Sequence, residues 1–200
     1  MTIDTIYSYF IECGSVCTDT RKIEQNCLFF ALKGESFNGN EFAHQALSKG
    51  ARYCIVDEKQ YENEHCFLVD DVLQTLQQLA TFHRNKMLKP VLALTGSNGK
   101  TTTKELINAV LAKKYNVTAT QGNLNNHIGV PLTLLRITDK TDIAIIEMGA
   151  NHQKEIEFLC LIAQPDYGLI TNFGKAHLEG FGGVEGVING KSEMYDYLKK

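Results

Sequence analysis

The clearest chemistry in this sequence lies in a short glycine-containing loop that ends in a lysine and two threonines. The loop consists of Gly96, Ser97, Asn98, Gly99, Lys100, Thr101 and Thr102. Glycines let successive backbone N–H groups turn toward an anion, the lysine neutralises phosphate charge, and a threonine hydroxyl can ligate Mg²⁺. An apolar run at 91–95 precedes the loop and a helical pattern at 101–112 follows it, which is the context that a phosphate site needs. We therefore predict that this loop binds ATP.

The spacing of the loop departs from the common pattern G-x-x-x-x-G-K-[ST]. Leu94 occupies the first glycine position, and Gly96 lies three residues before Gly99. The alternative is a glycine-rich turn followed by a solvated lysine, and the flanking strand and helix argue against it. That helix is amphipathic, with four apolar residues expected on one face: Leu106, Ile107, Val110 and Leu111.

Two further candidates follow strand-like runs later in the chain. Residues 142–146 are mostly apolar and end at the carboxylate of Glu147, and His177 follows the next strand-like run. Ligands of open α/β sheets bind at the carboxyl edge of the strands, so we predict that Glu147 holds Mg²⁺ opposite the loop. The alternative is an exposed glutamate at a strand end. The prediction for His177 has less support, because a single histidine in a loop is more often a surface group than a ligand. The candidate metal ligands are Thr101, Glu147 and His177.

The elements that position these residues suggest two α/β domains. Before Pro90, strand-like runs at 27–32, 51–56 and 67–69 alternate with helical patterns at 40–49 and 72–87. After it, strands at 91–95, 143–146 and 168–171 surround the loop and its helix, a doubly wound nucleotide-binding pattern. We place the boundary near Lys89. Residues 1–88 would form a small N-terminal domain, and residues 89–200 a P-loop domain that is truncated at its C-terminal end.

Composition excludes several classes of protein. The 200 residues, 44% hydrophobic, are enough for one large or two small domains, and a net charge of -3 gives no general attraction to nucleic acid or to an anionic membrane. The opening residues lack the pattern of a signal peptide, and no apolar run approaches the ~20 residues of a membrane span. The six cysteines form no C-x-x-C pair or zinc spacing. We expect a cytoplasmic protein with reduced cysteines, several of them in the core.

Seven segments carry a family resemblance across nearly the whole chain. They are TDTR at 18–21, LFFALKGE at 28–35, GSNGKTT at 96–102, GNLNNHIGVP at 122–131, EMGANH at 147–152, HLEGFG at 177–182 and GKSE at 190–193. In this order they resemble the Mur ligase family. The runs at 122–131 and 149–152 resemble its D-alanyl-D-alanine-adding branch, the MurF ligases. The short loop with Asn98 before Gly99 is also similar to that of folylpolyglutamate synthetases.

The resemblance implies a function for the whole protein. It implies an ATP-dependent acid–amino-acid ligase that joins D-alanyl-D-alanine to UDP-N-acetylmuramoyl-tripeptide through an acyl-phosphate, in peptidoglycan synthesis. The family has a C-terminal domain whose residues are not in this sequence, so this chain alone is expected to be inactive. The alternatives are another Mur-family ligase that is MurE-like, a P-loop small-molecule kinase, and a non-catalytic nucleotide-binding module.

The resemblance also implies roles for particular residues. The UDP substrate would be held by Thr18, Asp19, Thr20, Arg21, Asn123, Asn125 and Asn126. For the residues at 18–21, and likewise for the three asparagines, a polar turn without a binding role remains the alternative. Two Mg²⁺ ions would accompany ATP, and Lys191 would be carbamylated by CO₂ and act as a metal ligand; otherwise it is an ordinary solvated lysine. The implied catalytic residues are Lys100, Lys191 and His177.

Overall fold

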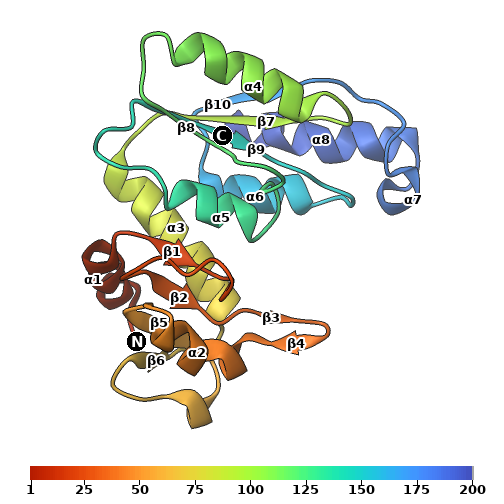
Figure 1. The fold of residues 1–200 in the computed structure, drawn as a ribbon. Coiled ribbons are helices and arrows are strands. Elements are labelled where there is room, and N and C mark those ends of the chain that lie inside the picture. Colours follow the sequence, from red (N-terminus) through yellow and green to blue (C-terminus); the bar gives the residue numbers. More distant parts are fainter. Residues whose placement is uncertain (200) are drawn as a thin grey trace. The chain divides into compact units, whose positions relative to one another are not determined.

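A computed structural model describes residues 1–199, which divide into two units, Met1–Phe82 and the residues from His83 onward (Figure 1). The division lies inside helix α3, Val72–Met87, whose bounds are the ones the sequence predicts. The predicted boundary near Lys89 stays a prediction. Each unit is built on a parallel four-stranded sheet, so the predicted α/β class is confirmed.

In the first unit the sheet has the strand order β1-β2-β5-β6. Its strands are β1 (Val16–Cys17), β2 (Leu28–Phe30), β5 (Tyr53–Val56) and β6 (Cys66–Leu68). Helices α1 (Ile3–Cys13) and α2 (Ala43–Ser48) and a hairpin of β3 (Lys33–Gly34) and β4 (Phe37–Asn38) complete the unit with two 3₁₀ turns, Gly39–Phe42 and Lys59–Tyr61. Helix α1 and the hairpin were not predicted.

The predicted helix at 40–49 is wrong at its start. The chain there forms a 3₁₀ turn before α2 begins at Ala43. The reason is the Asn38 carboxamide, whose Oδ1 accepts from the backbone N of Asn40 at 3.1 Å, while the side chain of Asn40 donates to Asp57 at 2.8 Å. These side-chain bonds hold the first turn in a tighter form than an α-helix.

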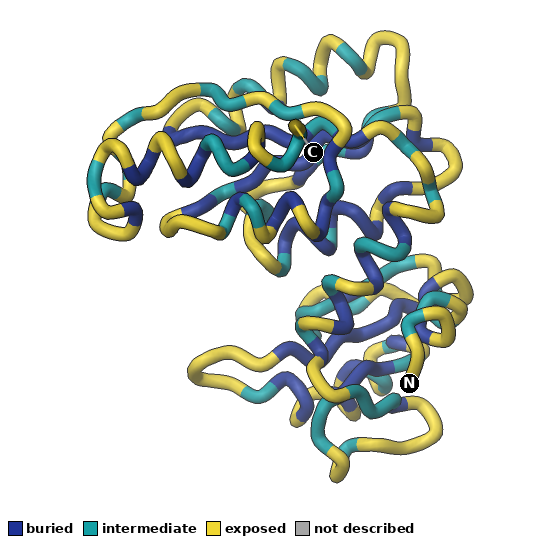
Figure 2. Tube along the Cα trace, turned by 180° about the vertical axis from the view of Figure 1, so that it is seen from behind, coloured by how far each residue is buried: buried dark blue, intermediate teal, exposed yellow. Residues whose placement is uncertain are grey.

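The core of the first unit contains four of the six cysteines. Cys17, Cys27, Cys54 and Cys66 are buried in one cluster with Phe29 and neighbouring alanines. All six cysteines lie within residues 1–199 and all are free thiols, as the sequence predicted. Figure 2 shows the buried segments in the interior of each unit, with exposed segments around them.

In the second unit the sheet has the order β10-β7-β9-β8, all parallel. The strands are β7 (Val91–Thr95), β8 (Val117–Ala119), β9 (Ile143–Glu147) and β10 (Tyr167–Ile170). The helices are α4 (Lys100–Leu111), α5 (Gly129–Leu134), α6 (Glu155–Ala163), α7 (Leu178–Phe181) and α8 (Val184–Leu198). Figure 1 shows α4 on one face of the sheet and α5 and α6 on the other, a doubly wound arrangement.

Helix α4 corrects one sequence-based expectation. Leu106 and Val110, expected on its apolar packing face, are 64% and 71% exposed. The helix instead directs Lys104 inward, where its Nζ donates to the backbone O of Thr120 at 2.6 Å and pairs with the Glu105 carboxylate at 2.7 Å. A buried ammonium must be paired, and these contacts supply the partners of Lys104 on the inward side of the helix. Among residues 1–199 no helix is both long and apolar enough to cross a membrane.

Candidate active site

The predicted phosphate loop lies between β7 and α4. Gly96 has φ of 144°, and a Cβ on it would lie 2.0 Å from Oγ1 of Thr171, so only glycine fits there. Residues after β10 hold the loop from the side: Ser97 N donates to Asn172 O at 3.1 Å, and Thr171 Oγ1 donates to Asn98 O at 2.7 Å. The loop is therefore supported on a neighbouring strand end before any ligand arrives.

Lys100 is the first residue of α4 and folds back over the loop. Its Nζ donates to Gly96 O at 2.8 Å. The ammonium thus lies directly at the loop whose backbone would receive phosphate oxygens. This is the position that charge neutralisation of a nucleotide requires.

Glu147 ends β9 and is 1% exposed. Its Oε1 accepts from Nδ2 of Asn125 at 2.9 Å and from Oγ1 of Thr101 at 3.3 Å. Its Oε2 is buried and has no hydrogen-bond partner among residues 1–199. An unsatisfied buried carboxylate oxygen is costly, and a hard cation beside the Thr101 hydroxyl would satisfy it. Glu147 and Thr101 therefore fit Mg²⁺.

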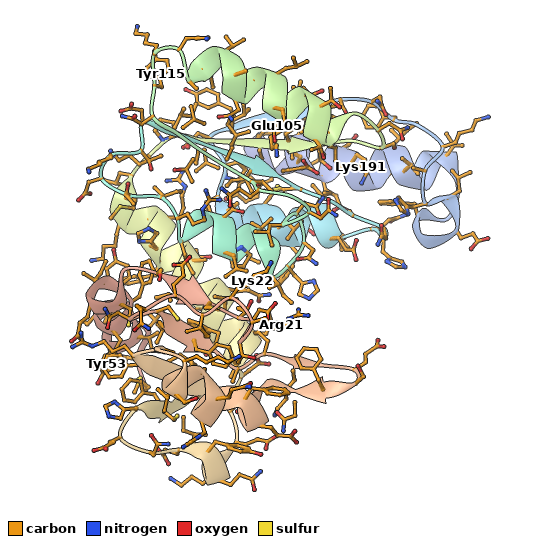
Figure 3. All side chains as sticks on the ribbon, in the orientation of Figure 1. Arg21, Lys22, Tyr53, Glu105, Tyr115 and Lys191 are labelled. Carbon is orange, nitrogen blue, oxygen red and sulfur yellow. The ribbon has the colours of Figure 1, made fainter. Side chains whose placement is uncertain are left out.

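Lys191 lies in α8 and is 2% exposed (Figure 3). Its Nζ donates to Ala150 O at 3.0 Å and lies 4.9 Å from the ring centre of Phe181. Burial, and to a smaller extent the nearby positive charge of Lys100, together lower the pKa of this amine to about 8. Gly190 leaves room for the ring, because a Cβ there would lie 2.5 Å from Phe181. The structure thus confines Lys191 in a site that disfavours the ammonium.

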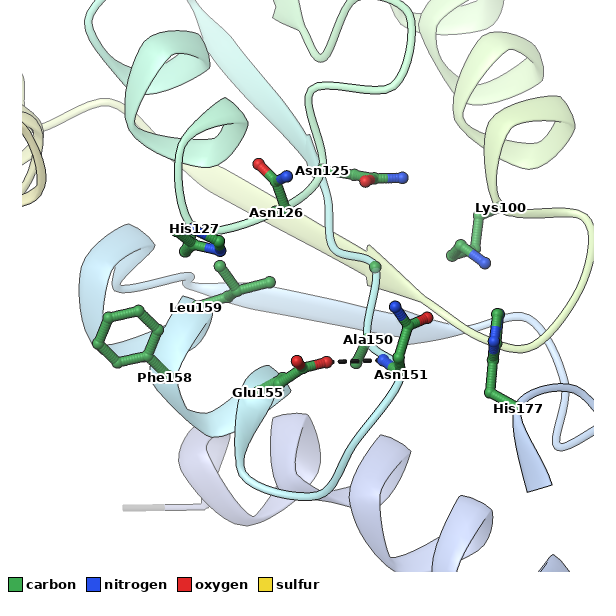
Figure 4. Close-up of a pocket in the computed structure, with 11 residues that line it drawn as sticks. Lys100, Asn125, Asn126, His127, Ala150, Asn151, Glu155, Phe158, Leu159 and His177 are labelled. Atoms are coloured by element: carbon green, nitrogen blue, oxygen red, sulfur yellow. Dashed lines mark hydrogen bonds between the residues drawn. The ribbon is translucent and has the colours of Figure 1, made fainter. Parts of the chain in front are cut away.

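A cavity of about 540 Å³ opens at this edge of the sheet (Figure 4). Its walls are formed by Lys100, Asn125, Asn126, His127, Gly149, Ala150, Asn151, Glu155, Phe158, Leu159 and His177. It therefore brings together four of the predicted site residues, Lys100, Asn125, Asn126 and His177. The wall residues of α6 were missed, because the sequence analysis did not recognise that helix.

His177 occupies an exposed position just before α7, with a φ of 57°. Figure 4 shows it on the same side of the cavity as Lys100. Among residues 1–199 no three histidine, cysteine, aspartate or glutamate side chains come close enough to hold a metal by themselves. The role of His177 as a metal ligand stays a prediction, and a cation at Glu147 would take its other ligands from hydroxyl and substrate oxygens.

In the loop at 123–126, two of the three predicted asparagines, Asn125 and Asn126, form hydrogen bonds within the protein. Asn126 Oδ1 accepts from the backbone N of Ile128 at 3.1 Å and of Gly129 at 2.9 Å, which holds the start of α5. Asn125 is bound to Glu147, as above, while Asn123 is exposed. Their predicted contact with the UDP substrate stays a prediction.

Two carboxylates brace the cavity wall around α6. Glu193 of α8 accepts from the backbone N of Lys154 at 2.7 Å and of Glu157 at 3.0 Å. Glu155 accepts from the backbone N of Asn151 at 2.6 Å. Carboxylates suit the N-terminus of a helix, where N–H groups lack partners. These bonds tie the helix that carries Lys191 to the wall of the cavity.

A second cavity, of about 510 Å³, lies in the first unit. Its walls are Thr18, Asp19, Thr20, Arg21, Phe29, Leu32, Phe37, Gly39, Phe42, Gln45 and Lys49. Four of the seven predicted UDP-site residues, those at 18–21, are among them, whereas the three predicted asparagines lie in the second unit. The hairpin and the following turn add Phe37 and Phe42, which the sequence analysis missed because it did not predict the hairpin.

Arg21 is 84% exposed and pairs with Asp19 (Figure 3). Its Nε donates to Asp19 Oδ1 at 2.9 Å and one terminal nitrogen donates to Oδ2 at 2.8 Å. These hydrogen bonds lower the pKa of Asp19 to about 2. Lys49 donates to Thr20 O at 2.9 Å. Two cationic side chains, Arg21 and Lys49, thus lie at the loop 18–21, and Arg21 is already paired with Asp19.

Comparison with known families defines the class of protein. Residues 12–91 match the model of the Mur ligase family catalytic domain, and residues 94–200 match that of the Mur ligase middle domain. The chain belongs to the Mur ligase family.

Similar ligases of known name narrow this class. A UDP-N-acetylmuramoyl-tripeptide–D-alanyl-D-alanine ligase of Bacillus subtilis is 46% identical over 92% of this chain and 41% of its own length, and that of Escherichia coli is 44% identical over 94% and 42%. A crystal structure of MurF from Acinetobacter baumannii has a TM-score of 0.86 at 39% identity, covering 93% of this chain and 41% of its own. The predicted resemblance to the N-terminal part of MurF is confirmed, and the chain spans less than half the length of these relatives.

Two more structures bear on the alternatives. A MurF ligase of Thermotoga maritima, solved in complex with ADP, has a TM-score of 0.83 at 35% identity, covering 92% of this chain and 43% of its own. A 2,6-diaminopimelate ligase of the family reaches a TM-score of only 0.52 at 18% identity, which shows a shared fold alone. The comparison therefore does not favour the MurE-like alternative.

Proposed function

We propose that this chain supplies the UDP-substrate and ATP sites of a ligase that adds D-alanyl-D-alanine to UDP-N-acetylmuramoyl-tripeptide in peptidoglycan synthesis. The observation that carries the proposal concerns the Glu147 carboxylate next to the phosphate loop. Its buried Oε2 has no hydrogen-bond partner among residues 1–199, and its Oε1 accepts from Thr101. A phosphoryl-transfer site needs such an oxygen at this place. The names of the similar ligases support the choice of substrates.

The second unit would bind and activate ATP. The terminal carboxylate of the tripeptide attacks the γ-phosphorus and ADP leaves, which gives an acyl-phosphate. The amine of D-alanyl-D-alanine then attacks the acyl carbon, loses a proton, and expels phosphate. Lys100 offsets negative charge on the phosphates, and the loop Gly96–Thr102 would orient them through its N–H groups. His177, on the same side of the cavity, would complete the site.

Two Mg²⁺ ions, when bound, would offset the repulsion between the nucleotide phosphates and the attacking carboxylate. Thr101 and Glu147 would hold one of them. Lys191 would contribute as a carbamate: its neutral amine forms an N–C bond to CO₂ and releases a proton. Burial favours the neutral amine, and the carbamate keeps one N–H that can still donate to Ala150 O.

The first unit would hold the UDP moiety. Thr18 and Thr20 offer hydroxyl and backbone groups to the uracil, and Arg21 and Lys49 offer positive charge to the diphosphate. The exposed rings of Phe37 and Phe42 provide apolar surface in the same cavity. The proposed reaction uses two nucleotides, ATP and the UDP-linked tripeptide, and we propose that the protein works in the cytoplasm, where ATP is available.

A product assay by mass spectrometry tests the proposal in the whole ligase that carries these residues. With ATP, UDP-N-acetylmuramoyl-tripeptide and D-alanyl-D-alanine, we expect the pentapeptide product, ADP and phosphate. Added hydroxylamine should divert the acyl-phosphate to a hydroxamate. Ligation of a free amino acid to the UDP-dipeptide would instead indicate a MurE-like enzyme. A stable phosphorylated product would indicate a kinase, and nucleotide binding without turnover a non-catalytic module.

A further inference from the structure

The loop between β8 and α5 places one asparagine directly on the proposed metal-binding carboxylate. We infer that Asn125 is a positioning residue, which orients Glu147 so that Oε2 faces the cation, and that it does not bind the UDP substrate. The inference rests on the proposed function, because it takes Glu147 as a metal ligand. It departs from the sequence-based role of Asn125.

The geometry around Asn125 fixes it from two sides. Its Nδ2 donates to Oε1 of Glu147 at 2.9 Å, and its backbone O accepts from the N of Gly149 at 2.8 Å. A Cβ on Gly149 would lie 3.1 Å from Cγ of Asn125, so the missing side chain lets the two segments approach closely. Asn125 is therefore bound to the backbone two residues beyond the carboxylate that it contacts.

The chemistry of an amide suits this task. An amide nitrogen only donates, so its bond occupies Oε1 and leaves the other oxygen for a different partner. Because the amide is neutral, it holds the carboxylate without cancelling its charge. A lysine in the same place would pair with Glu147 and compete with a cation. Outer partners of this kind fix the orientation of metal-ligating groups.

The backbone of Glu147 is held independently from the opposite side. Its N donates to Oγ1 of Thr120 at 2.9 Å, and Lys104, fully buried, donates to the O of Thr120. Main chain and side chain of Glu147 are thus positioned by different elements. Asn125 and Thr101 both donate to Oε1, and the shorter bond, from Asn125, restricts the rotation of the carboxylate.

Metal affinity is the readout that separates this role from substrate binding. Mn²⁺ is the probe, titrated into the whole ligase with ADP and followed by electron paramagnetic resonance. We expect Asn125→Ala and Asn125→Leu to weaken Mn²⁺ binding about tenfold or more, the usual effect of removing such a partner. The dissociation constant of UDP-N-acetylmuramoyl-tripeptide should stay within about twofold. Leucine fills the volume that alanine would leave empty, so it guards against a packing defect.

Three comparisons complete the design. Asn116→Ala, at an exposed asparagine before β8, is the matched control and should leave Mn²⁺ binding unchanged. Glu147→Gln tests the proposed function itself: if Mn²⁺ binding survives it, the metal assignment fails. If Glu147→Gln abolishes binding while a folded Asn125→Leu protein binds Mn²⁺ normally, only the present inference is overturned. Weakened UDP-substrate binding with normal Mn²⁺ affinity would also overturn it and restore the substrate role.

Discussion

The two cavities of this protein are built on opposite principles. Beside the cavity of the second unit two chargeable groups are buried: Glu147 and Lys191 are 1% and 2% exposed. Glu147 forms hydrogen bonds with several elements, and Lys191 donates to Ala150 O. In the first unit the charged groups lie at the surface, and Arg21 is paired with its neighbour Asp19. Buried charges are costly to maintain, so they are expected where a cation or a transition state uses them. Exposed charges suit reversible recognition of a nucleotide.

The two sites also differ in how far apart along the sequence their bonded residues lie. Thr18–Arg21 form one continuous loop whose main ion pair joins residues two positions apart. Glu147 takes its partners from residues 46 and 22 positions away, and Lys191 bonds to a residue 41 positions away. A change in the second unit should therefore disturb a network, whereas a change in the first should have a limited and local effect.

The largest expected effect is that of Lys100→Ala. Removing the ammonium at the phosphate loop should lower kcat for ATP turnover by at least about 10²–10³-fold, because a charge aimed at the transferred phosphate is lost. Binding of the UDP substrate, measured by calorimetry, should be unchanged. Lys113→Ala, at an exposed lysine after α4, is the control. Undiminished turnover in Lys100→Ala would remove the phosphate-loop assignment.

Lys191→Ala should come next. We expect a loss of activity of at least about 10–100-fold, the range for residues that only support a metal ligand, because the carbamate would be a ligand itself. Formate or acetate should restore part of the activity, since a small carboxylate can occupy the place of the carbamate. Chloride at the same ionic strength is the control. Near-normal activity that no carboxylate alters would make Lys191 a bystander.

A smaller effect is expected from Arg21→Ala. A lost charge-assisted hydrogen bond costs ~1.5–3 kcal/mol, and we expect the lower end because Asp19 already engages the guanidinium. Affinity for the UDP substrate should fall and ATP affinity should stay the same. Lys22→Ala removes an adjacent exposed charge and should have less effect (Figure 3). Equal losses for both ligands would contradict the division between the two units.

The smallest effect concerns His83, which is buried and donates to Ile137 O at 2.8 Å in its neutral form. Burial lowers its pKa below 6.5. As pH falls through about 6.5 the unfolded chain gains a proton that the folded ring does not, so stability decreases. Between pH 7 and 5 the free energy of unfolding should fall more for this protein than for His83→Gln, whose amide can donate without titrating. Parallel Tm curves for the two proteins would refute this.

Local pattern was sufficient for much of the fold. The bounds of α3 were predicted as observed, and the strand before the phosphate loop was found at Val91–Thr95. Both follow from periodicity and from glycine and proline positions within a short window. The residue types of the phosphate loop also predict its chemistry, since its glycines, lysine and threonine suit a bound phosphate.

Tertiary structure alone decided how these groups meet. An apolar stripe cannot reveal that α4 turns Lys104 inward and leaves Val110 exposed, because that choice depends on a carbonyl 16 positions away. Nor could sequence show that Asn125 holds one oxygen of Glu147 and leaves the other bare. Hydrogen bonds are short-ranged and directional, so residues far apart in sequence acquire such roles only when the parallel sheet brings their strand ends to one edge.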